Sequence, residues 1–256
     1  FNIDKLTYAG NLNNTKSFKK NIRYKFIKGC ICDKSLIDKI FKRHKIDGVI
    51  NFAAESHVDK SIVNPEIFVE TNIIGVYTLL NTCYTNWMDT NFKYKTEFKH
   101  AKFYQISTDE VYGSIDKGKF SESSELMPNS PYSASKASAD MLTRSFNKTF
   151  GIKTLISRCS NNFGPNQHKE KFIPKIIENI KNKNNIPVYG DGKNIRDWIY
   201  VLDHCVGIEK VFNNGRPGCI YNIGGDNEIS NLELINIIAE SMGMTKKINK
   251  LIKFVP

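Results

Sequence analysis

Tyr132 and Lys136 stand four residues apart in the stretch Tyr-Ser-Ala-Ser-Lys. On a helix, residues at this spacing share one face, so the ammonium is expected beside the phenol. A nearby positive charge favours the phenolate and lowers the pKa of a phenol, which is about 10 when unperturbed. Such a pair could take a proton from a substrate hydroxyl. Alone it is a weak signal, because this spacing occurs on many helix faces by chance.

Three further groups stand together in the stretch Ser-Thr-Asp-Glu-Val-Tyr-Gly. Thr108 ends an expected strand, and its hydroxyl could bond the same substrate oxygen as Tyr132. Asp109 and Glu110 follow directly, and two carboxylates in a partly closed site can serve as one acid and one base. This set of groups suits the oxidation of a sugar alcohol followed by the elimination of water.

An alternation of strands and helices is expected to position these residues. Apolar runs predict strands at 24–27, 48–52, 102–107, 154–158, 187–189 and 221–223. Helical patterns predict helices at 35–44, 65–87, 133–150, 172–182, 201–213 and 231–242. The alternation predicts an α/β fold with a Rossmann-like, doubly wound parallel sheet and a smaller substrate-binding lobe.

The composition limits the class of protein. The chain has 256 residues, 40% of them hydrophobic, so it can bury a sizeable core. It has no run of 18 apolar residues, and we expect no transmembrane helix and no membrane partner. The six cysteines form no framework and no second Cys-x-Cys pair, which favours reduced thiols in a cytoplasmic protein and no metal site.

The net charge of +11 raises the question of a nucleic-acid partner. Lysine-rich segments occur at 16–28, 93–102, 181–183 and 246–253. They lie between or beyond the expected elements and lack the interleaved aromatic residues of a recognisable module. We therefore expect solvated lysine faces, with some attraction for a nucleotide diphosphate, and no nucleic-acid partner.

Several ordered motifs resemble the dTDP-glucose 4,6-dehydratase family, in the extended, nucleotide-sugar-modifying branch of the short-chain dehydrogenase/reductase superfamily. Besides the two stretches above, they are Asp4–Asn11, Phe52–Ser61, Cys159–Pro165, Glu170–Pro174, Arg196–Trp198 and Tyr221–Gly225. The resemblance runs from the first residue to about Asn231. It implies a homodimeric enzyme that uses NAD to convert a nucleoside-diphosphate glucose to the 4-keto-6-deoxy sugar.

The resemblance also implies a role for each catalytic group. Tyr132, with Lys136 and Thr108, would take the proton of the 4-hydroxyl while a hydride leaves carbon 4 for NAD. Glu110 would then remove the proton at carbon 5. Asp109 would protonate the departing 6-hydroxyl before the hydride returns to carbon 6.

The resemblance implies an NAD-binding domain at residues 1–160 and a mainly substrate-binding lobe at 161–256. The implied cofactor contacts are Asp4, Lys5, Leu6, Thr7, Cys30, Ile31, Phe52, Ala53, Ala54, Glu55, Thr71, Tyr132, Lys136 and Asn162. Asp4 would accept the hydroxyls of the adenosine ribose, and Ile31 could pack on the adenine ring. The family usually has an aspartate in place of Cys30, and a thiol is a poor acceptor for the adenine amino group.

A second set of residues is implied for the substrate. It comprises Ser56, His57, Thr108, Asn161, Lys171, Phe172, Pro187, Val188, Tyr189, Arg196 and Asn231. Lys171 and Arg196 suit a diphosphate, and residues 187–189 would form the platform of the nucleobase. Structural roles stay open for several of them: His57 could be structural, the asparagine pair could form a turn, and Asn231 could cap a helix.

One expected motif is missing, since no Gly-x-x-Gly-x-x-Gly occurs in the sequence. We therefore expect a fragment that lacks both termini, including roughly 30 residues of the first βα unit. Two alternative functions stay open. One is an epimerase or decarboxylase of the same branch, which does not need adjacent carboxylates, and the other is a non-catalytic remnant. The choice between thymidine and uridine as the base also stays open.

Overall fold

The structure is a computed structural model that describes residues 1–255, without the side chains of Lys246 and Lys247. The chain forms two compact units. Unit 1 comprises Phe1–Cys159 and Ile208–Asn222, and unit 2 comprises Ser160–Gly207 and the residues from Ile223 onward. Within the described part of the chain, no helix is both long and apolar enough to cross a membrane.

Unit 1 contains most of the elements. Its strands are β1 (Asn2–Asp4), β2 (Phe26–Lys28), β3 (Gly48–Asn51), β4 (Met88–Thr90), β5 (Lys93–Tyr94), β6 (Lys102–Thr108) and β7 (Thr154–Cys159). Its helices are η1 (Leu12–Phe18), α1 (Lys34–Arg43), α2 (Val58–Val63), α3 (Glu66–Val69), η2 (Glu70–Ile74), α4 (Gly75–Trp87), η3 (Thr96–Phe98), η4 (Asp109–Tyr112) and α5 (Pro131–Phe150). Two elements, α7 (Val201–Asn214) and β11 (Ile220–Ile223), have residues in both units.

The main sheet of unit 1 has the strand order β11-β7-β6-β3. Strands β3, β6 and β7 are parallel, with Gly48 opposite Lys102 and Phe103 opposite Thr154. From Phe103 to Thr108, every residue of β6 is buried. Such an unbroken buried run is typical of a parallel strand that is covered on both faces.

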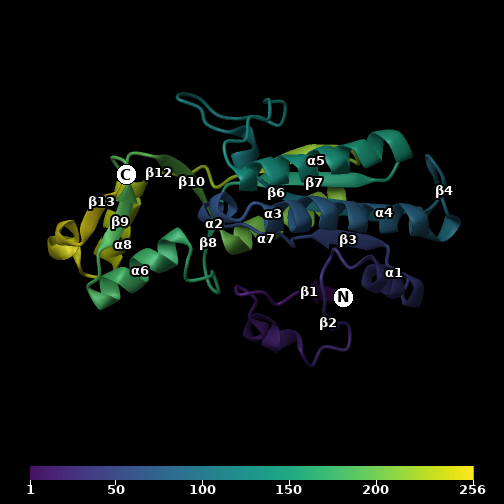
Figure 1. Ribbon diagram of the computed structural model, residues 1–256, viewed down its shortest axis with the longest axis horizontal. Coiled ribbons are helices and arrows are strands. Elements are labelled where there is room, and N and C mark those ends of the chain that lie inside the picture. Colours follow the sequence, from purple (N-terminus) through teal and green to yellow (C-terminus); the bar gives the residue numbers. More distant parts are fainter. Residues whose placement is uncertain (256) are drawn as a thin grey trace. The chain divides into compact units, whose positions relative to one another are not determined.

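Helices cover both faces of this sheet. Phe103 packs with residues of α4 and α5 such as Leu80 and Ala139, and these two helices lie side by side along the strands (Figure 1). The next residue, Tyr104, points to the opposite face and stacks on Phe212 of α7, with 6.4 Å between ring centroids. The arrangement is that of a doubly wound α/β sheet.

Helix α5 begins earlier than the predicted start at residue 133. Ser130 is its N-cap, Pro131 occupies the first turn, and the side chains of Ser130 and Ser133 form a capping box. The helix ends at Phe150, and its C-cap Gly151 has a left-handed φ of 78°. Tyr132 therefore lies inside the first turn rather than before it.

The single helix predicted at 65–87 is wrong in detail. The structure has α3, then the π-helical turn η2, and only then α4. A π-helical turn inserts one extra residue, which changes the direction of the side chains and often marks a functional site. Thr71 and Asn72 lie in this turn.

Strands β1 and β2 form a separate two-stranded sheet instead of extending the main one. They run parallel, with Ile3 opposite Ile27, so the strand predicted at 24–27 is shifted by about two residues. The prediction missed α2 and the hairpin of β4 and β5. These elements are too short to show a period in the sequence.

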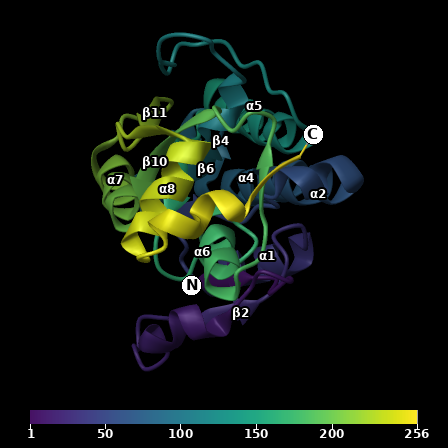
Figure 2. The ribbon, with the colours of Figure 1, turned by 90° about the vertical axis from the view of Figure 1, so that its left-hand side faces the viewer.

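Unit 2 has its own core. Its elements are β8 (Asn161–Phe163), α6 (Phe172–Asn182), β9 (Ile186–Tyr189), β10 (Ile195–Tyr200), β12 (Glu228–Ser230), α8 (Asn231–Ser241), η5 (Thr245–Lys250) and β13 (Ile252–Val255). Three strands form a sheet in the order β12-β10-β8, and β13 pairs with β9 in parallel. Helices α6 and α8 pack together (Figure 2), and Ile176, Ile180 and Ile235 are buried among them.

Candidate active site

The carboxylates predicted to be catalytic lie where the buried strand β6 ends. Thr108 is the N-cap of η4, and its hydroxyl oxygen accepts a hydrogen bond of 3.3 Å from the amide of Glu110. The same hydroxyl donates to Oδ1 of Asp109 at 3.2 Å. Both carboxyl side chains are half-buried. They lie at the carboxyl end of a parallel strand, the edge at which open α/β sheets bind ligands.

The chain closes this turn with a glycine. Gly113 has a φ of 86°, and a Cβ at this position would lie 2.2 Å from the carbonyl oxygen of Met127. The neighbouring amide of Met127 donates to the carbonyl of Val111 at 3.1 Å. Only glycine suits both the left-handed backbone and the close approach.

The structure brings Tyr132 to this turn, as the sequence predicts. The phenol of Tyr132 is buried, and it lies close enough to Thr108 and Glu110 for both side chains to influence its pKa. The Phe68 ring meets it edge-on, with 6.3 Å between the centroids. A hydroxyl, a phenol and two carboxylates thus share one site.

The expected lowering of the phenol pKa by Lys136 is wrong. The ammonium of Lys136 donates a hydrogen bond of 2.7 Å to the carbonyl of Ile106 in β6. Burial raises the pKa of Tyr132 well above its ordinary value, and the charge of Glu110 raises it further. Burial also lowers the pKa of Lys136, while the charge of Asp140 opposes that shift.

Asn72 is a site residue that the sequence analysis did not select. It is buried, its amide oxygen accepts from the amide of Glu55 at 2.9 Å, and its Nδ2 donates to the carbonyl of Glu55 at 3.0 Å. Nδ2 also donates to the hydroxyl of Ser135, which in turn donates to the carbonyl of Tyr132. The amide therefore ties the loop after β3 to the first turns of α5.

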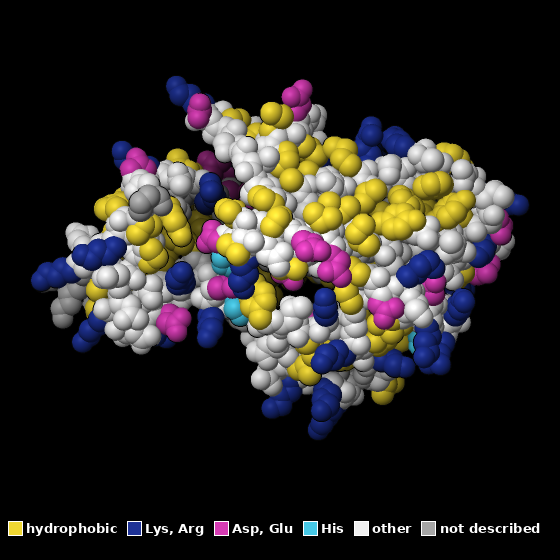
Figure 3. All heavy atoms as spheres, in the orientation of Figure 1, with side chains coloured by type: hydrophobic (Ala, Val, Ile, Leu, Met, Phe, Trp, Pro, Cys, Tyr) yellow, Lys and Arg dark blue, Asp and Glu magenta, His cyan; other side chains and the backbone are white. Residues whose placement is uncertain are grey.

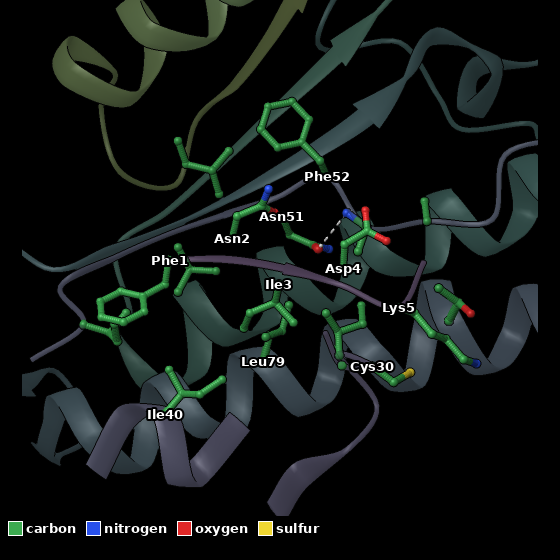
Figure 4. A pocket seen from close by; sticks show the side chains of 18 of the residues that line it. Phe1, Asn2, Ile3, Asp4, Lys5, Cys30, Ile40, Asn51, Phe52 and Leu79 are labelled. Carbon is green, nitrogen blue, oxygen red and sulfur yellow. Dashed lines mark hydrogen bonds between the residues drawn. The ribbon is translucent and has the colours of Figure 1, made fainter. Parts of the chain in front are cut away.

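A cavity of about 640 Å³ lies between the ends of β1 and β3 in unit 1 (Figure 4). Ten of the predicted cofactor contacts line it: Asp4, Lys5, Thr7, Cys30, Ile31, Phe52, Ala53, Ala54, Glu55 and Thr71. Ile3, Ile40 and Leu79 add apolar walls. Leu6, Tyr132 and Lys136 do not line it.

The lining fits NAD in part. The carboxylate of Asp4 is exposed at the end of β1, where a ribose could bond it, and the small side chains of Ala53 and Ala54 let a ligand approach the backbone. Ile31 fits less well, since it is buried and a Cβ at Gly75 would touch its Cδ1 at 2.6 Å. The Cys30 sulfur accepts a hydrogen bond from the amide of Cys32.

Leu6 has a strained backbone. Its φ is 53°, a left-handed value that is uncommon for a branched side chain. The amide of Leu6 donates to Oδ1 of Asp4 at 2.6 Å, which holds the turn after β1. The turn keeps the Asp4 carboxylate at the mouth of the cavity.

Ser56 and His57, two predicted substrate contacts, lie in unit 1, where His57 is the N-cap of α2. The predicted contacts that remain lie in unit 2. Asn161 and Asn162 belong to β8, and Nδ1 of His204 lies 2.8 Å from Oδ1 of Asn162. Phe172 stacks on Trp198 with 6.3 Å between ring centroids, and Lys171 directly precedes α6.

The nucleobase platform predicted at 187–189 is divided between two environments. Val188 is buried in the core of unit 2, whereas the side chain of Tyr189 is 59% exposed. Arg196 is exposed on β10. Ser230, not Asn231, is the N-cap of α8, which removes the capping role left open for Asn231.

Comparison with known proteins decides the family. A family model described as GDP-mannose 4,6 dehydratase matches residues 1–254. The chain belongs to this family. Within the family it is 45% identical, over 238 residues, to a dTDP-glucose 4,6-dehydratase of Xanthomonas campestris pv. campestris (strain B100). That match covers 93% of this chain and 67% of the relative, and the resemblance read from the motifs is confirmed.

Two solved structures have the same fold as this chain. A double mutant of dTDP-glucose 4,6-dehydratase from Streptomyces venezuelae, with NAD and DAU bound, has a TM-score of 0.90 and 41% identity, over 99% of this chain and 73% of that chain. A UDP-glucuronic acid 4-epimerase from Bacillus cereus, with UDP-glucuronic acid and NAD, has a TM-score of 0.86 and 26% identity, over 99% and 76% of the two chains. The Rossmann-like fold class is thereby confirmed.

Proposed function

We propose that the chain uses NAD to dehydrate a nucleoside-diphosphate glucose, with dTDP-glucose as the substrate, to the 4-keto-6-deoxy sugar. The observation that carries the proposal is the set of groups at the end of β6. Thr108 bonds Asp109 and the amide of Glu110, and the phenol of Tyr132 lies near the same turn. The 45% identity to a dTDP-glucose 4,6-dehydratase supports the same substrate.

Residues of the cavity between β1 and β3 would hold the cofactor. Asp4 would bond the adenosine ribose, while Ala53 and Ala54 leave room beside the backbone. When bound, NAD supplies the acceptor for the hydride of carbon 4 and the donor that returns it to carbon 6. Cys30 would stand near the adenine, where its thiol accepts a hydrogen bond only weakly.

Tyr132 is the base of the first step. Its phenolate takes the proton of the sugar 4-hydroxyl, and the hydroxyl of Thr108 holds the same oxygen in place. Lys136 anchors α5 to the carbonyl of Ile106, which fixes the position of Tyr132 relative to β6. A positioned base of this kind contributes about 10²–10⁴ to the rate.

The two carboxylates divide the elimination between them. The carbonyl formed at carbon 4 acidifies carbon 5, so Glu110 can remove that proton. Asp109 donates a proton to the departing 6-hydroxyl, which leaves as water. Two carboxyl groups side by side favour one protonated and one ionised member, as this step requires.

Unit 2 supplies the predicted nucleotide contacts. Lys171 and Arg196 would bind the diphosphate, and the exposed ring of Tyr189 would stack on the base. The assignment of the cofactor to residues 1–160 and of the substrate mainly to 161–256 is part of this proposal.

A nucleotide-sugar epimerase is the second candidate, because the Bacillus cereus epimerase shares the fold. Incubation with dTDP-glucose and with UDP-glucose, followed by mass measurement of the products, separates the two. A dehydratase releases a product that is lighter by one water molecule. An isomer of unchanged mass would replace the dehydratase assignment with the epimerase one.

A homodimer formed through α4 and α5 completes the proposal. Hydrophobic side chains gather over these helices (Figure 3). Tyr77 of α4 and Met141 of α5 are about half-exposed. Exposed apolar patches of this kind are typical of interfaces. Sedimentation should give a dimer that Tyr77→Glu dissociates and the control Ile22→Glu leaves intact.

The compartment is also part of the proposal. The six free cysteines of the chain suit a reducing compartment such as the cytoplasm.

A further inference from the structure

Arg158 and Asp140 form an ion pair inside unit 1. Nε of Arg158 lies 2.9 Å from Oδ2 of Asp140, and the two side chains are only 3% and 2% exposed. Moving two charges out of water costs several kcal/mol per ion, so such a pair adds little net stability over apolar residues. Its presence calls for a role other than stability.

The pair extends to the catalytic turn through Tyr112. NH1 of Arg158 donates a hydrogen bond of 2.9 Å to the phenol oxygen of Tyr112, and the guanidinium lies 4.8 Å from the centre of that ring. Tyr112 is the last residue of η4, the turn that begins with Asp109 and Glu110. Arg158 therefore holds the end of the turn that carries both carboxylates.

Two further contacts fix the ring of Tyr112. Its hydroxyl donates to Oδ1 of Asn222 at 2.7 Å, and its ring stacks on Phe120 with 4.9 Å between centroids and 13° between planes. The tyrosine is 2% exposed. With its oxygen and its face both engaged, it has a single position available.

The other end of the pair reaches the catalytic helix. Asp140 stands four residues after Lys136 on α5, on the same helix face. Its charge opposes the lowering of the Lys136 pKa by burial. The buried groups thus run from α5, through Asp140 and Arg158, to Tyr112 at the end of η4.

We propose that Asp140, Arg158 and Tyr112 are positioning residues that hold the carboxylate turn in register with the catalytic helix. The proposal rests on the proposed function. It assigns these side chains no contact with the substrate. Their effect is to keep Asp109 and Glu110 at a set distance from Tyr132, so that elimination can follow oxidation on the same sugar.

The central test is Tyr112→Phe, which keeps the ring and its stacking but removes the oxygen that Arg158 binds. We expect kcat to fall by about 10- to 100-fold with KM little changed, since small displacements of catalytic groups cost this much. Elimination should slow more than oxidation, so NADH should accumulate during a single turnover. Tyr104→Phe is the control, because it removes a buried hydroxyl from β6, outside these contacts.

The variant Arg158→Lys provides a second, independent test of the proposal. Lysine keeps a positive charge opposite Asp140 but lacks the forked geometry needed to reach Tyr112 as well. It should reproduce the NADH accumulation of Tyr112→Phe. The double variant should be no slower than the slower single variant, because both changes break the same link. If the rate losses of the two single variants multiply in the double variant, the proposal is overturned.

Hydrogen exchange separates this proposal from the proposed function. The amides of residues 109–113 should exchange faster in Tyr112→Phe and Arg158→Lys than in Tyr104→Phe, whatever the substrate. Unchanged exchange in this turn overturns the positioning role. If the unsubstituted chain dehydrates neither sugar nucleotide but the two variants show the faster exchange, only the proposed function is overturned. Equal slowing of oxidation and elimination would reduce the three residues to a structural role.

Discussion

The buried ammonium of Lys136 donates its 2.7 Å hydrogen bond to the carbonyl of Ile106, not to the phenol of Tyr132. Lys136 thereby fastens α5 to β6. Lys136 therefore does not lower the pKa of Tyr132. Burial raises that pKa most, and the charge of Glu110 raises it further. The two proposed bases, Tyr132 and Glu110, are therefore electrostatically coupled.

The first prediction is a pH dependence of the oxidation step. Because the pKa of Tyr132 is raised, its phenolate fraction grows as the pH increases, and NADH formation in a single turnover should speed up from about pH 7 to about pH 10. Glu110→Gln removes a negative charge that raises this pKa. The rise should then shift to lower pH, and an unshifted profile would show that Glu110 does not influence Tyr132.

The second prediction separates the roles of the two bases. Tyr132→Phe should abolish NADH formation on addition of the sugar nucleotide, because no group is left to take the 4-hydroxyl proton. Glu110→Gln should still form NADH, which accumulates because carbon 5 keeps its proton. Each change should lower turnover by about 10²-fold or more. Absorbance of NADH and product mass measure both, and normal turnover of Glu110→Gln would remove it from the mechanism.

Local rules suffice to predict that the proposed catalytic residues lie together. Thr108, Asp109 and Glu110 are consecutive, and a helix places Lys136 one turn after Tyr132, so their proximity needs little knowledge of the rest of the fold. Thr108 and Tyr132 lie near each other because helix α5 packs on strand β6. The longer strands and helices of unit 1, such as β6 and α5, show a clear hydrophobic pattern in the sequence.

Other parts of the site depend on distant partners. The carbonyl that Lys136 binds is set by how α5 lies on β6, which periodicity does not specify. Arg158 and Asp140 resemble surface charges until their pairing inside unit 1 is known. The amide of Asn72 lies in a π-helical turn within a segment whose pattern predicts one regular helix.

The third prediction concerns the glycine that closes the catalytic turn. Gly113→Ala places a Cβ against the carbonyl oxygen of Met127 and a side chain at a left-handed φ. The left-handed backbone alone costs about 1–2 kcal/mol, and the clash adds to it. Gly118→Ala is a matched control, since Gly118 has a φ of 95° and its nearest neighbour is 3.8 Å away. Urea unfolding should show a larger loss for Gly113→Ala, and equal losses would exclude the clash.

The fourth prediction is that His204 makes unit 2 sensitive to mild acid. An amide oxygen only accepts, so Nδ1 of His204 carries the proton that Oδ1 of Asn162 accepts at 2.8 Å. Within the described residues, Nε2 is buried without a hydrogen-bond partner. A second proton there would add an unpaired buried N–H and a buried charge. Burial accordingly lowers the pKa of His204 below its ordinary value of 6.5.

The sign of the effect follows from proton linkage. As the pH falls below about 6.5, the unfolded chain binds a proton at His204 before the folded chain does, so the free energy of unfolding decreases until the folded pKa is passed. The melting temperature should therefore drop more between about pH 7.5 and about pH 5.5 in the unsubstituted chain than in His204→Gln. His100→Gln, at an exposed position in unit 1, serves as the control and should keep the full drop. If His204→Gln shows the same drop as the control, another group accounts for the acid sensitivity.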